Sequence, residues 1–402
     1  METLLADAEA LSTTVVDLRR RIHRQPETGL DLPLTQAIVT GRLDALGIAY
    51  RKGKGLSSVV GTVEGGSPGP DVILRADMDA LPVREESGLE FASQVDGVMH
   101  ACGHDTHVAM LLGAAELLAA RRDRFAGRAI LMFQPGEEGF GGADLMLDEG
   151  LLDGVDAATA RAFAVHTTAA FESGTVNVRS GPFLAAPDAL EIEVSGRGGH
   201  AAEPHRTVDP IPVAAEIITA LQTAVTRRVN VFDPAVISIT RMQAGTSHNI
   251  VPDTALLQGT IRTLSPTTRA TVHGVVERVV QGIAAAHGAT ARTTISPGYP
   301  PTVNDAGATE LIRAAATDLL GPAAVRVMPA PRMGGEDFSY VLQRVAGAMV
   351  FLGARPADLD PATAPMNHSG RVVFDETVLP LGIALHVAFV QRANPVGGRP
   401  DQ

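Results

Sequence analysis

The sequence predicts an α/β protein with a smaller α+β domain inserted into it. Apolar runs typical of buried strands alternate with helical segments over the first 180 residues and again after residue 300. Polar residues directly follow several of these runs, which is where α/β folds place their chemistry. Near residue 183 the pattern changes to strands that alternate apolar and acidic residues, as expected of a sheet with one wet face. We therefore expect a larger domain formed by residues 1–182 and 298–402, and an inserted domain over 183–297.

The first half of the chain supplies most elements of the larger domain. Apolar residues at steps of three and four predict a helix over 4–22, ended by Pro26, and Gly47 ends a second helix over 35–46. The further elements expected are strands at 58–63, 71–76, 129–134 and 162–166, and helices at 108–120 and 143–152. The glycine-rich segment 65–69 predicts a hairpin or a short loop between the first two strands.

The inserted domain is expected to contain two helices and about four strands. Its clearest elements are strands at 190–196, 235–240 and 255–262, and helices at 213–228 and 271–287. The α/β pattern resumes after Pro300 and closes with a strand at 350–353 and a helix near 379–391.

Composition excludes several classes of protein. The chain has 402 residues, 45 % of them hydrophobic, and a formal net charge of −12, which argues against binding to nucleic acid or to an anionic membrane. No window offers the roughly twenty uncharged apolar residues of a transmembrane helix, and the N-terminus lacks the pattern of a signal peptide. A single cysteine permits no internal disulfide. We therefore expect a cytoplasmic protein.

The segment His100-Ala-Cys102-Gly-His104-Asp-Thr-His107 holds three of the twelve histidines and the only cysteine. Gly103 lets the backbone bend, so that Cys102 and His104 can point at one place. Thiolate and imidazole both bind borderline-soft divalent metals, and their density here predicts a metal site. Taken singly, a buried cysteine or a helix-capping histidine would be the commoner interpretation.

Further candidate ligands end predicted strands or occupy glycine-rich turns: Asp77, Asp79, Glu137, Glu138, His166 and His368. Imidazoles, a thiolate and a carboxylate can hold two divalent ions, and such a site also needs a carboxylate outside the metals to move a proton. The Glu137-Glu138 pair offers one residue for each task, because neighbouring side chains in an extended turn point opposite ways. Each residue alone also has a structural interpretation, as a capping, surface or core group.

Several separated motifs can be compared with known families: 18–27 (LRRRIHRQPE), 75–82 (RADMDALP), 100–105 (HACGHD), 135–138 (PGEE), 198–205 (GGHAAEPH) and 333–339 (MGGEDFS). Together they resemble the M20 family of metallopeptidases and amidohydrolases, and more narrowly its branch of N-acyl-L-amino-acid amidohydrolases. That branch includes hippurate hydrolases and hydrolases of indole-acetyl amino acids. The Cys-Gly-His motif is the specific one, because most other M20 branches use an aspartate as the metal bridge.

The resemblance implies a Zn-peptidase-like catalytic domain, with a mixed central sheet flanked by helices, and a lid and dimerisation domain at 183–297. Cys102 would bridge two divalent ions (Mn, Zn, Co or Ni), and His104, Glu138, His166 and His368 would complete their coordination. Glu137 would be the general base that takes a proton from the attacking water and returns it to the leaving amine. Asp79 would orient a ligand. Asp77 falls where other branches place a metal-binding histidine and is left out of the ligand set, while His100 and His107 would have structural or orienting roles.

In the inserted domain the resemblance implies contacts to substrate. His200 resembles a histidine that reaches into a neighbouring subunit's site and steadies the oxyanion, with His205 as a rival. Asn249 and Arg262 match positions that hold the substrate carboxylate or the scissile carbonyl, although Arg262 could equally be a surface charge at a strand end. The expected substrate is a small N-acyl amino acid, and the expected assembly is a homodimer or larger homo-oligomer. The alternatives are a dipeptidase or aminoacylase of the same fold, or a non-catalytic binding protein.

Two segments depart from the pattern of the branch. Residues 29–34 (GLDLPL) replace a stretch that usually carries glutamate, which would alter the entrance loop. Residues 364–369 (APMNHS) give an unusual approach to His368, although the His-Ser pair itself is intact.

Overall fold

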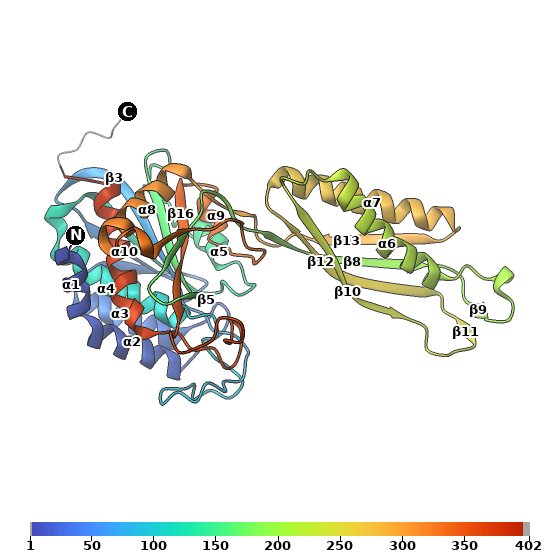
Figure 1. Cartoon of the computed structure of the whole chain (residues 1–402), viewed down its shortest axis with the longest axis horizontal. Coiled ribbons are helices and arrows are strands. Elements are labelled where there is room, and N and C mark those ends of the chain that lie inside the picture. The colour runs from blue at the N-terminus through green and yellow to red at the C-terminus, as the bar shows by residue number, and fades with distance from the viewer. Residues whose placement is uncertain (1, 397–402) are drawn as a thin grey trace. The chain divides into compact units, whose positions relative to one another are not determined.

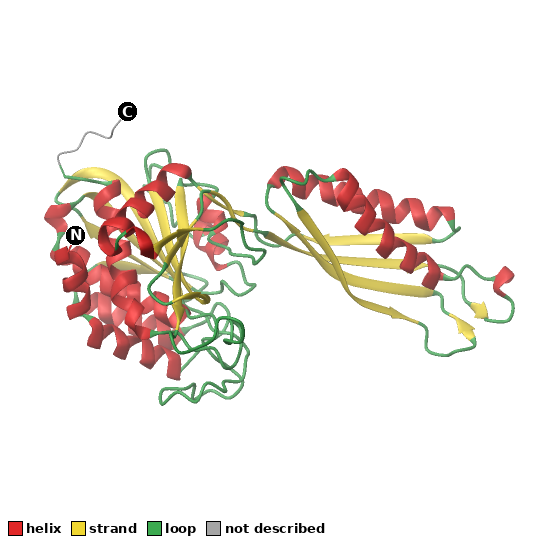
Figure 2. Ribbon diagram, viewed as in Figure 1, coloured by secondary structure: helices red, strands yellow, loops and turns green. Residues whose placement is uncertain are grey.

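The computed structural model describes residues 2–396 and divides the chain into two compact units (Figures 1 and 2). The first unit combines Met1–Gly181, Val303–Ala330 and Tyr340–Gln402, and the second combines Pro182–Thr302 with Pro331–Ser339. The sequence placed the boundaries after residues 182 and 297. The structure differs chiefly in grouping Pro331–Ser339 with the second unit, because its backbone pairs there: Arg332 N–H donates to Phe183 O and Ala185 N–H to Gly334 O, both at 2.9 Å.

The first unit is built on a mixed sheet of eight strands. In spatial order they are β1 (Ala49–Lys52), β2 (Val59–Glu64), β4 (Ala126–Gln134), β3 (Ser67–Asp77), β5 (Arg161–Glu172), β16 (Gly347–Arg355), β6 (Val176–Val178) and β15 (Val325–Val327). The central strands β4, β3, β5 and β16 run parallel to one another. They are apolar almost throughout and buried, as parallel strands covered on both faces must be.

The structure decides one expectation for this sheet and corrects another. Of the hairpin or short loop expected between β2 and β3, it shows the short loop, because β4 inserts between the two strands and pairs with both. The expected short strand at 162–166 continues to Glu172, so His166 lies within β5 and not at its tip. In both cases the sequence shows only the apolar core of a strand, whereas pairing with neighbours decides its partner and its length.

Helices cover the sheet of the first unit. They are α1 (Glu2–Ala10), α2 (Ser12–Arg24), α3 (Pro33–Ala45), α4 (His104–Ala120), α5 (Gly142–Asp148), α8 (Ala306–Leu320) and α10 (Leu379–Ala393), with the short α9 (Ser339–Leu342). The expected single helix over 4–22 is divided at Leu11 into α1 and α2. Helix α4 is buried on nearly every side, because it packs on β3 and β5 and is covered by α2 and α10. Contact with α10 is so close that a Cβ on Gly382 would lie 1.9 Å from the sulfur of Met110.

The second unit is a four-stranded antiparallel sheet covered by two helices. Its strands, in order, are β10 (Ala235–Ala244), β12 (Thr254–Thr263), β8 (Ala186–Ser195) and β13 (Thr290–Ser296), and its helices are α6 (Pro210–Arg228) and α7 (Pro266–Ala286). The apolar faces of both helices and of the sheet form a separate core around Ile192, Leu257 and Val276. A short ladder of β9 (Gly199–His200) and β11 (Ile250–Val251) extends beyond β8 and β12. The expected two helices and four strands are therefore confirmed.

Two further short strands, β7 (Gly181–Leu184) and β14 (Thr302–Asn304), lie near the residues where the chain passes from one unit to the other. Among the described residues, no helix combines the length and the apolar character needed to cross a membrane.

Candidate functional site

Seven of the predicted site residues meet in the first unit, although they come from five segments of the chain. Cys102 and His104 lie at the start of α4, and Asp79 follows β3. Glu137 and Glu138 form the turn after β4, His166 lies in β5, and His368 lies in the segment between β16 and the 3-10 turn Glu376–Val378. Because β3, β4 and β5 are parallel, their carboxyl-terminal halves bring these side chains to one edge of the sheet.

Gly103 sets the directions of Cys102 and His104. It precedes α4 with φ 86°, a left-handed conformation that favours glycine, and a Cβ there would lie 2.6 Å from Thr167 Oγ1. His104 Nδ1 lies 2.8 Å from the backbone oxygen of Asp79, which can only accept. Nδ1 of His104 therefore carries the proton, and the lone pair of Nε2 points into the site.

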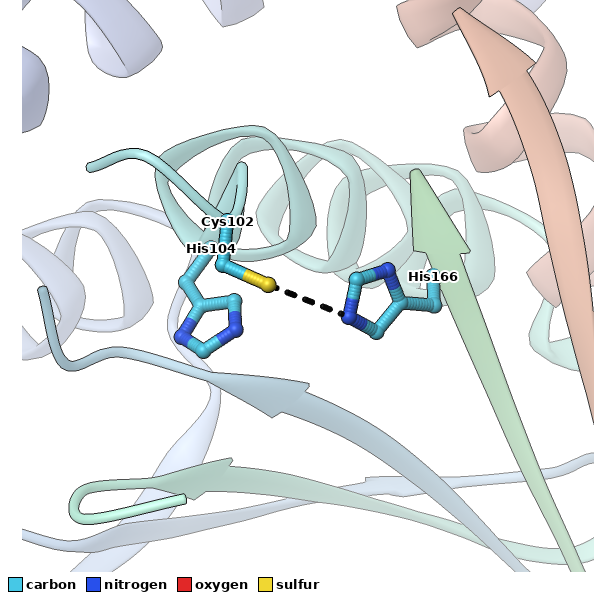
Figure 3. A group of neighbouring side chains, drawn as sticks. All are labelled: Cys102, His104 and His166. Carbon is cyan, nitrogen blue, oxygen red and sulfur yellow. Dashed lines mark hydrogen bonds between the residues drawn. The ribbon is translucent and has the colours of Figure 1, made fainter. Parts of the chain in front are cut away.

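His166 is fixed in the same way. Its Nδ1 lies 2.7 Å from the backbone oxygen of Thr167, so Nδ1 is the donor and Nε2 carries the lone pair. Nε2 lies 3.6 Å from Cys102 Sγ (Figure 3). Figure 3 shows the sulfur directed at the ring of His166, with His104 on the other side of Cys102. Two imidazole lone pairs and one sulfur thus converge on a small volume.

Asp79 holds the turn that carries the two glutamates. Its Oδ1 accepts the backbone N–H of Glu137 and its Oδ2 that of Glu138, each at 3.0 Å. The side chain of Glu138 reaches the histidines, with Oε1 at 3.3 Å from Nε2 of His368 and 3.9 Å from Nε2 of His104. Asp79 therefore acts through two neighbours at once: its backbone oxygen orients His104, and its carboxylate shapes the Glu137-Glu138 turn.

The donor atoms have the composition and spacing of a two-metal site. Among the described residues, possible ligand atoms lie within 4.8 Å of one another in the groups Cys102-His104-His166, Cys102-Glu138-His368 and His104-Glu137-Glu138. Nε2 of His104 and Oε1 of Glu138 are buried and have no hydrogen-bond partner. A buried polar atom without a partner is costly, and a cation would satisfy both atoms. The side chains therefore fit divalent ions that favour nitrogen, sulfur and oxygen ligands.

The electrostatics of the site reflect its burial and its charges. Burial, reinforced by His107 nearby, lowers the pKa of His166 well below its usual value, so this imidazole is neutral and able to ligate. Burial also opposes the charged form of His104, but the negative charges of Asp77 and Cys102 outweigh it and raise the pKa of His104. Pairing with Cys102 and Glu138 raises the pKa of His368 to about 10. The negative charges of Asp77, Cys102 and Glu138 thus favour a bound proton at the place where two cations would bind.

A buried hydrogen-bond network around Asp77, which the sequence did not predict as part of the site, lies next to it. Asp77 accepts from Arg75 NH1 at 2.7 Å and from His107 Nδ1 at 2.5 Å. Nε2 of His107 accepts the backbone N–H of Thr167 at 2.8 Å. Burial disfavours the charged form of Asp77, yet Arg75, His104 and His107 lower its pKa well below the usual range. The spacing of Arg75 and Asp77 on β3 was the available signal, because alternate residues of a strand share one face.

Two residues of the segment 18–27 contact Asp105 in α4. His23 Nδ1 lies 2.8 Å and Arg19 Nε 2.9 Å from Oδ2 of Asp105, the residue after His104, and all three side chains are buried. His23 Nε2 also contacts Glu85 Oε1 at 3.2 Å. Burial disfavours a charged His23, but Asp105 and Glu85 raise its pKa to about 9. His100, packed near His23, is fully buried, and burial lowers its pKa to about 4.

Three of the predicted residues lie together at one end of the second unit, and Arg262 lies at the other end. His200 lies in β9 opposite Ile250 of β11, and Asn249 accepts the backbone N–H of Ala201 with its own carbonyl at 3.1 Å. His205 follows in the 3-10 turn Pro204–Arg206. The side chains of His200, His205 and Asn249 are exposed. The ladder thus presents all three at a tip of the unit.

Arg262 lies in β12, at the end of the four-stranded sheet farther from this tip. It pairs with Pro187 of β8, whereas the tip follows Ser195 of β8, which pairs with Thr254. Eight residues of strand separate the two ends, which is roughly 26 Å at 3.3 Å per residue. The guanidinium donates to the backbone oxygen of Met333 at 3.3 Å, in the segment 333–339 that matched the resemblance. The interpretation of Arg262 as a bare surface charge is therefore not supported, because its side chain is half-buried against that segment.

Comparison with known proteins agrees with this architecture. The profile of Peptidase family M20/M25/M40 matches residues 73–392. The chain is 41% identical over 390 residues to thermostable carboxypeptidase 2 of Saccharolobus solfataricus, covering 96% of this chain and 97% of that protein. It is 41% identical over 297 residues to an N-acyl-L-amino acid amidohydrolase of Geobacillus stearothermophilus, covering 74% and 79%.

A solved structure has the same fold. The YXEP protein of Bacillus subtilis, described as a dinuclear metal-binding peptidase of the M20 family, superposes with a TM-score of 0.82 at 33% identity, covering 95% of this chain and 98% of that one. The profile match spans most of the chain, and the likeness extends through both units. The chain therefore belongs to peptidase family M20/M25/M40.

Proposed function

We propose that the chain is a metal-dependent amidohydrolase that cleaves the amide bond of N-acyl amino acids. The observation that carries the proposal is the convergence of Cys102, His104, Glu138, His166 and His368, with buried atoms on His104 and Glu138 that make no hydrogen bond, beside a second carboxylate on Glu137. We assign the first five residues to two divalent ions, with Cys102 between them. Bound ions would polarise the scissile carbonyl and acidify a water molecule. Their identity among Mn, Zn, Co and Ni depends on availability as well as on ligand type.

Glu137 is the proposed general base. Its carboxylate lies with the imidazole of His104 and the carboxylate of Glu138 in one group of possible ligand atoms, so it is close enough to the reacting centre to move a proton. It takes a proton from the attacking water and delivers it to the departing amine nitrogen. Asp79 holds the turn of Glu137 in place through the backbone N–H, so the base is oriented before substrate arrives.

The second unit is proposed to supply contacts to substrate from two chains. His200 would steady the oxyanion, with Asn249 beside it and His205 as the rival, and Arg262 would bind a carboxylate or the scissile carbonyl. The end of β8 next to the tip and Arg262 lie roughly 26 Å apart along the strands, farther than a small N-acyl amino acid can reach. If all of them contact one substrate, either the tip or Arg262 must come from a second copy, and we propose that it is the tip. A homodimer or larger homo-oligomer formed through the second unit is therefore part of the proposal.

The names of the relatives favour substrates with a free carboxylate on the amine side. A carboxypeptidase and an N-acyl-L-amino acid amidohydrolase both cleave an amide whose nitrogen belongs to an amino acid with a free α-carboxylate. Carboxypeptidase activity on short peptides is therefore the second candidate, ahead of dipeptidase activity. The cytoplasm is the proposed location, because a buried, free Cys102 thiol suits a reducing compartment.

The test combines metal analysis with a panel of substrates. Protein stripped with a chelator and reloaded with each candidate metal should hydrolyse N-acetyl, N-benzoyl or indole-acetyl amino acids only when reloaded. The matching N-acyl amino acid amides, which lack the carboxylate, should be cleaved at least about 100-fold more slowly, since an unpaired Arg262 would be left in the site. Faster cleavage of short peptides than of every N-acyl amino acid would favour the carboxypeptidase. Turnover that survives the chelator unchanged would contradict the proposal.

A further inference from the structure

Asn367, the residue before His368, has contacts that the proposed chemistry does not explain. His368 lies in the segment between β16 and the turn Glu376–Val378, which forms neither helix nor strand. Ser369 N–H donates to Met366 O at 3.0 Å, so residues 366–369 close a turn. Within that turn His368 has φ 72°, and it is the only described residue other than glycine with a positive φ. This conformation costs a residue other than glycine about 1–2 kcal/mol, so surrounding contacts must hold it.

The side-chain amide of Asn367 ties this turn to β5. Its Oδ1 accepts from Thr168 Oγ1 at 3.1 Å and from the backbone N–H of Ala169 at 3.0 Å. Its Nδ2 donates to the backbone oxygens of Cys102 and Thr167, each at 3.2 Å. The two N–H groups of Nδ2 face carbonyl oxygens, and Oδ1 faces an O–H and an N–H group. Only this orientation of the amide therefore satisfies all four partners.

These contacts link three of the assigned ligands. The Thr167 oxygen that accepts from Asn367 also accepts from His166 Nδ1 at 2.7 Å, so one carbonyl connects the amide to that imidazole. Nδ2 lies 3.9 Å from Cys102 Sγ, close enough for a weak N–H to sulfur contact. His368, the next residue, is 56% exposed at its side chain; its backbone N–H donates to Ala101 O at 2.8 Å, and its Nε2 lies 3.3 Å from Glu138 Oε1.

We propose that Asn367 is a positioning residue that fixes His368, Cys102 and His166 relative to one another. This inference rests on the proposed two-metal site and adds to it a residue that ligates nothing itself. Its amide supplies the support that a strand gives His166 and a helix gives His104, and it holds a half-exposed histidine in a left-handed turn. Residues that orient metal ligands typically change metal affinity 10–100-fold when they are replaced.

The decisive variant is Asn367→Asp, which keeps the size of the side chain and the acceptor for Thr168 and Ala169. It replaces the donor by an oxygen that would face the carbonyls of Cys102 and Thr167. Thr168→Val is the matched control, because it removes one contact to Asn367 and leaves both Nδ2 contacts in place. Cobalt(II) is the probe, titrated into the metal-free chain under buffered free-metal conditions. Stoichiometry is read by elemental analysis, and the thiolate-to-cobalt absorption band reports on Cys102.

Asn367→Asp should bind at least one of the two ions about 10–100-fold more weakly and should alter the thiolate band, while Thr168→Val stays within about threefold of the parent. Both metal-free variants should unfold at the parent temperature, which separates positioning from loss of fold. A parent that binds two ions and an Asn367→Asp variant that binds both equally tightly, with the same band, would overturn only the role of Asn367. A parent that binds fewer than two ions would overturn the two-metal site, and this inference with it.

Discussion

The two units carry their candidate functional residues in opposite ways. In the first unit all the groups except His368 are buried or half-buried, and other residues hold them, as Asp79 holds the backbone of Glu137 and Glu138. In the second unit His200, His205 and Asn249 are exposed at the tip of a two-stranded ladder, and mainly the backbone positions them. The first unit thus contains a preorganised site, whereas the tip of the second has the features of a surface that completes a site elsewhere.

This contrast separates two kinds of contribution to catalysis. A buried constellation of ligands creates its own low-dielectric environment, in which charges interact strongly. An exposed histidine lies in such a low-dielectric environment only when another surface covers it. Substitutions in the first unit should therefore affect metal binding or chemistry within a single chain, and substitutions at the tip should depend on the partner.

The largest effect is expected from Glu137→Gln. The amide keeps the shape of the side chain but cannot accept a proton, so turnover should fall about 10⁴-fold, the upper range for loss of a general base. Two metal ions should remain bound, because the assigned ligands are unchanged. Steady-state kinetics and elemental analysis measure the two quantities. The exposed neighbour Asp144, changed to Asn, is the control and should keep parental turnover. A Glu137→Gln protein that hydrolyses N-acyl amino acids at close to the parental rate would refute the mechanism.

A smaller loss, about 10²–10³-fold in kcat, is expected for His200→Ala, the range for removing one oxyanion donor. Metal content and stability should not change, because this side chain is exposed and lies outside the metal site. His248→Ala, an exposed histidine of the same tip, is the matched control. His205→Ala tests the rival: a loss there and none at His200 would exchange their roles.

The His200→Ala variant also tests whether the tip of one subunit acts in the site of another. Mixing His200→Ala with Glu137→Gln under exchange conditions should restore about a quarter of parental activity if each site takes its histidine from the partner of a symmetric dimer. Half of the dimers are then mixed, and each has one complete site. No restoration in a demonstrated mixed dimer would mean that the histidine acts within its own chain or not at all.

The smallest effect is expected from His23→Gln, which tests whether the first unit is held together by its buried ionic network. The pKa of His23 is raised from 6.5 to about 9 in the folded chain. His23 should therefore stabilise the parent by about 3 kcal/mol or less at pH 6.5 and below, and this contribution should be lost as the pH rises through 9. The charged groups around it are Asp105, Glu85 and Arg19, and the ring of His100, whose pKa is lowered to about 4, packs near it uncharged.

Urea unfolding of the parent and the variant between pH 6 and 10 measures this difference. The two stability curves should be farthest apart at low pH and should converge toward pH 10. His287→Gln, at an exposed histidine paired with Glu216, is the control and should shift the curve little at any pH. A difference that stays constant with pH would show that His23 contributes by packing and not by charge.

Comparison of particular residues shows which parts of the site could be predicted. Cys102, His104, Glu137 and Glu138 were found because their motifs are local: a glycine between two ligands, and two carboxylates in a glycine-rich turn. Asp77 was left out of the ligand set because it falls where other branches place a metal-binding histidine, and its contact with His107, 30 residues along the chain, was not predicted. Asn367 was visible only as part of an unusual segment, since its partners lie about 200 and 265 residues away.

The sequence by itself determined the alternation of strands and helices, the change of pattern near residue 183 and the chemical types of the ligands. These follow from periodicity and composition, which are local properties of a chain. Only the tertiary structure decided that β4 separates β2 from β3, that His166 lies inside a long strand, and that Arg262 and His200 lie at opposite ends of the second unit. Strand order, register and the meeting of distant side chains depend on long-range packing, which no window of the sequence contains.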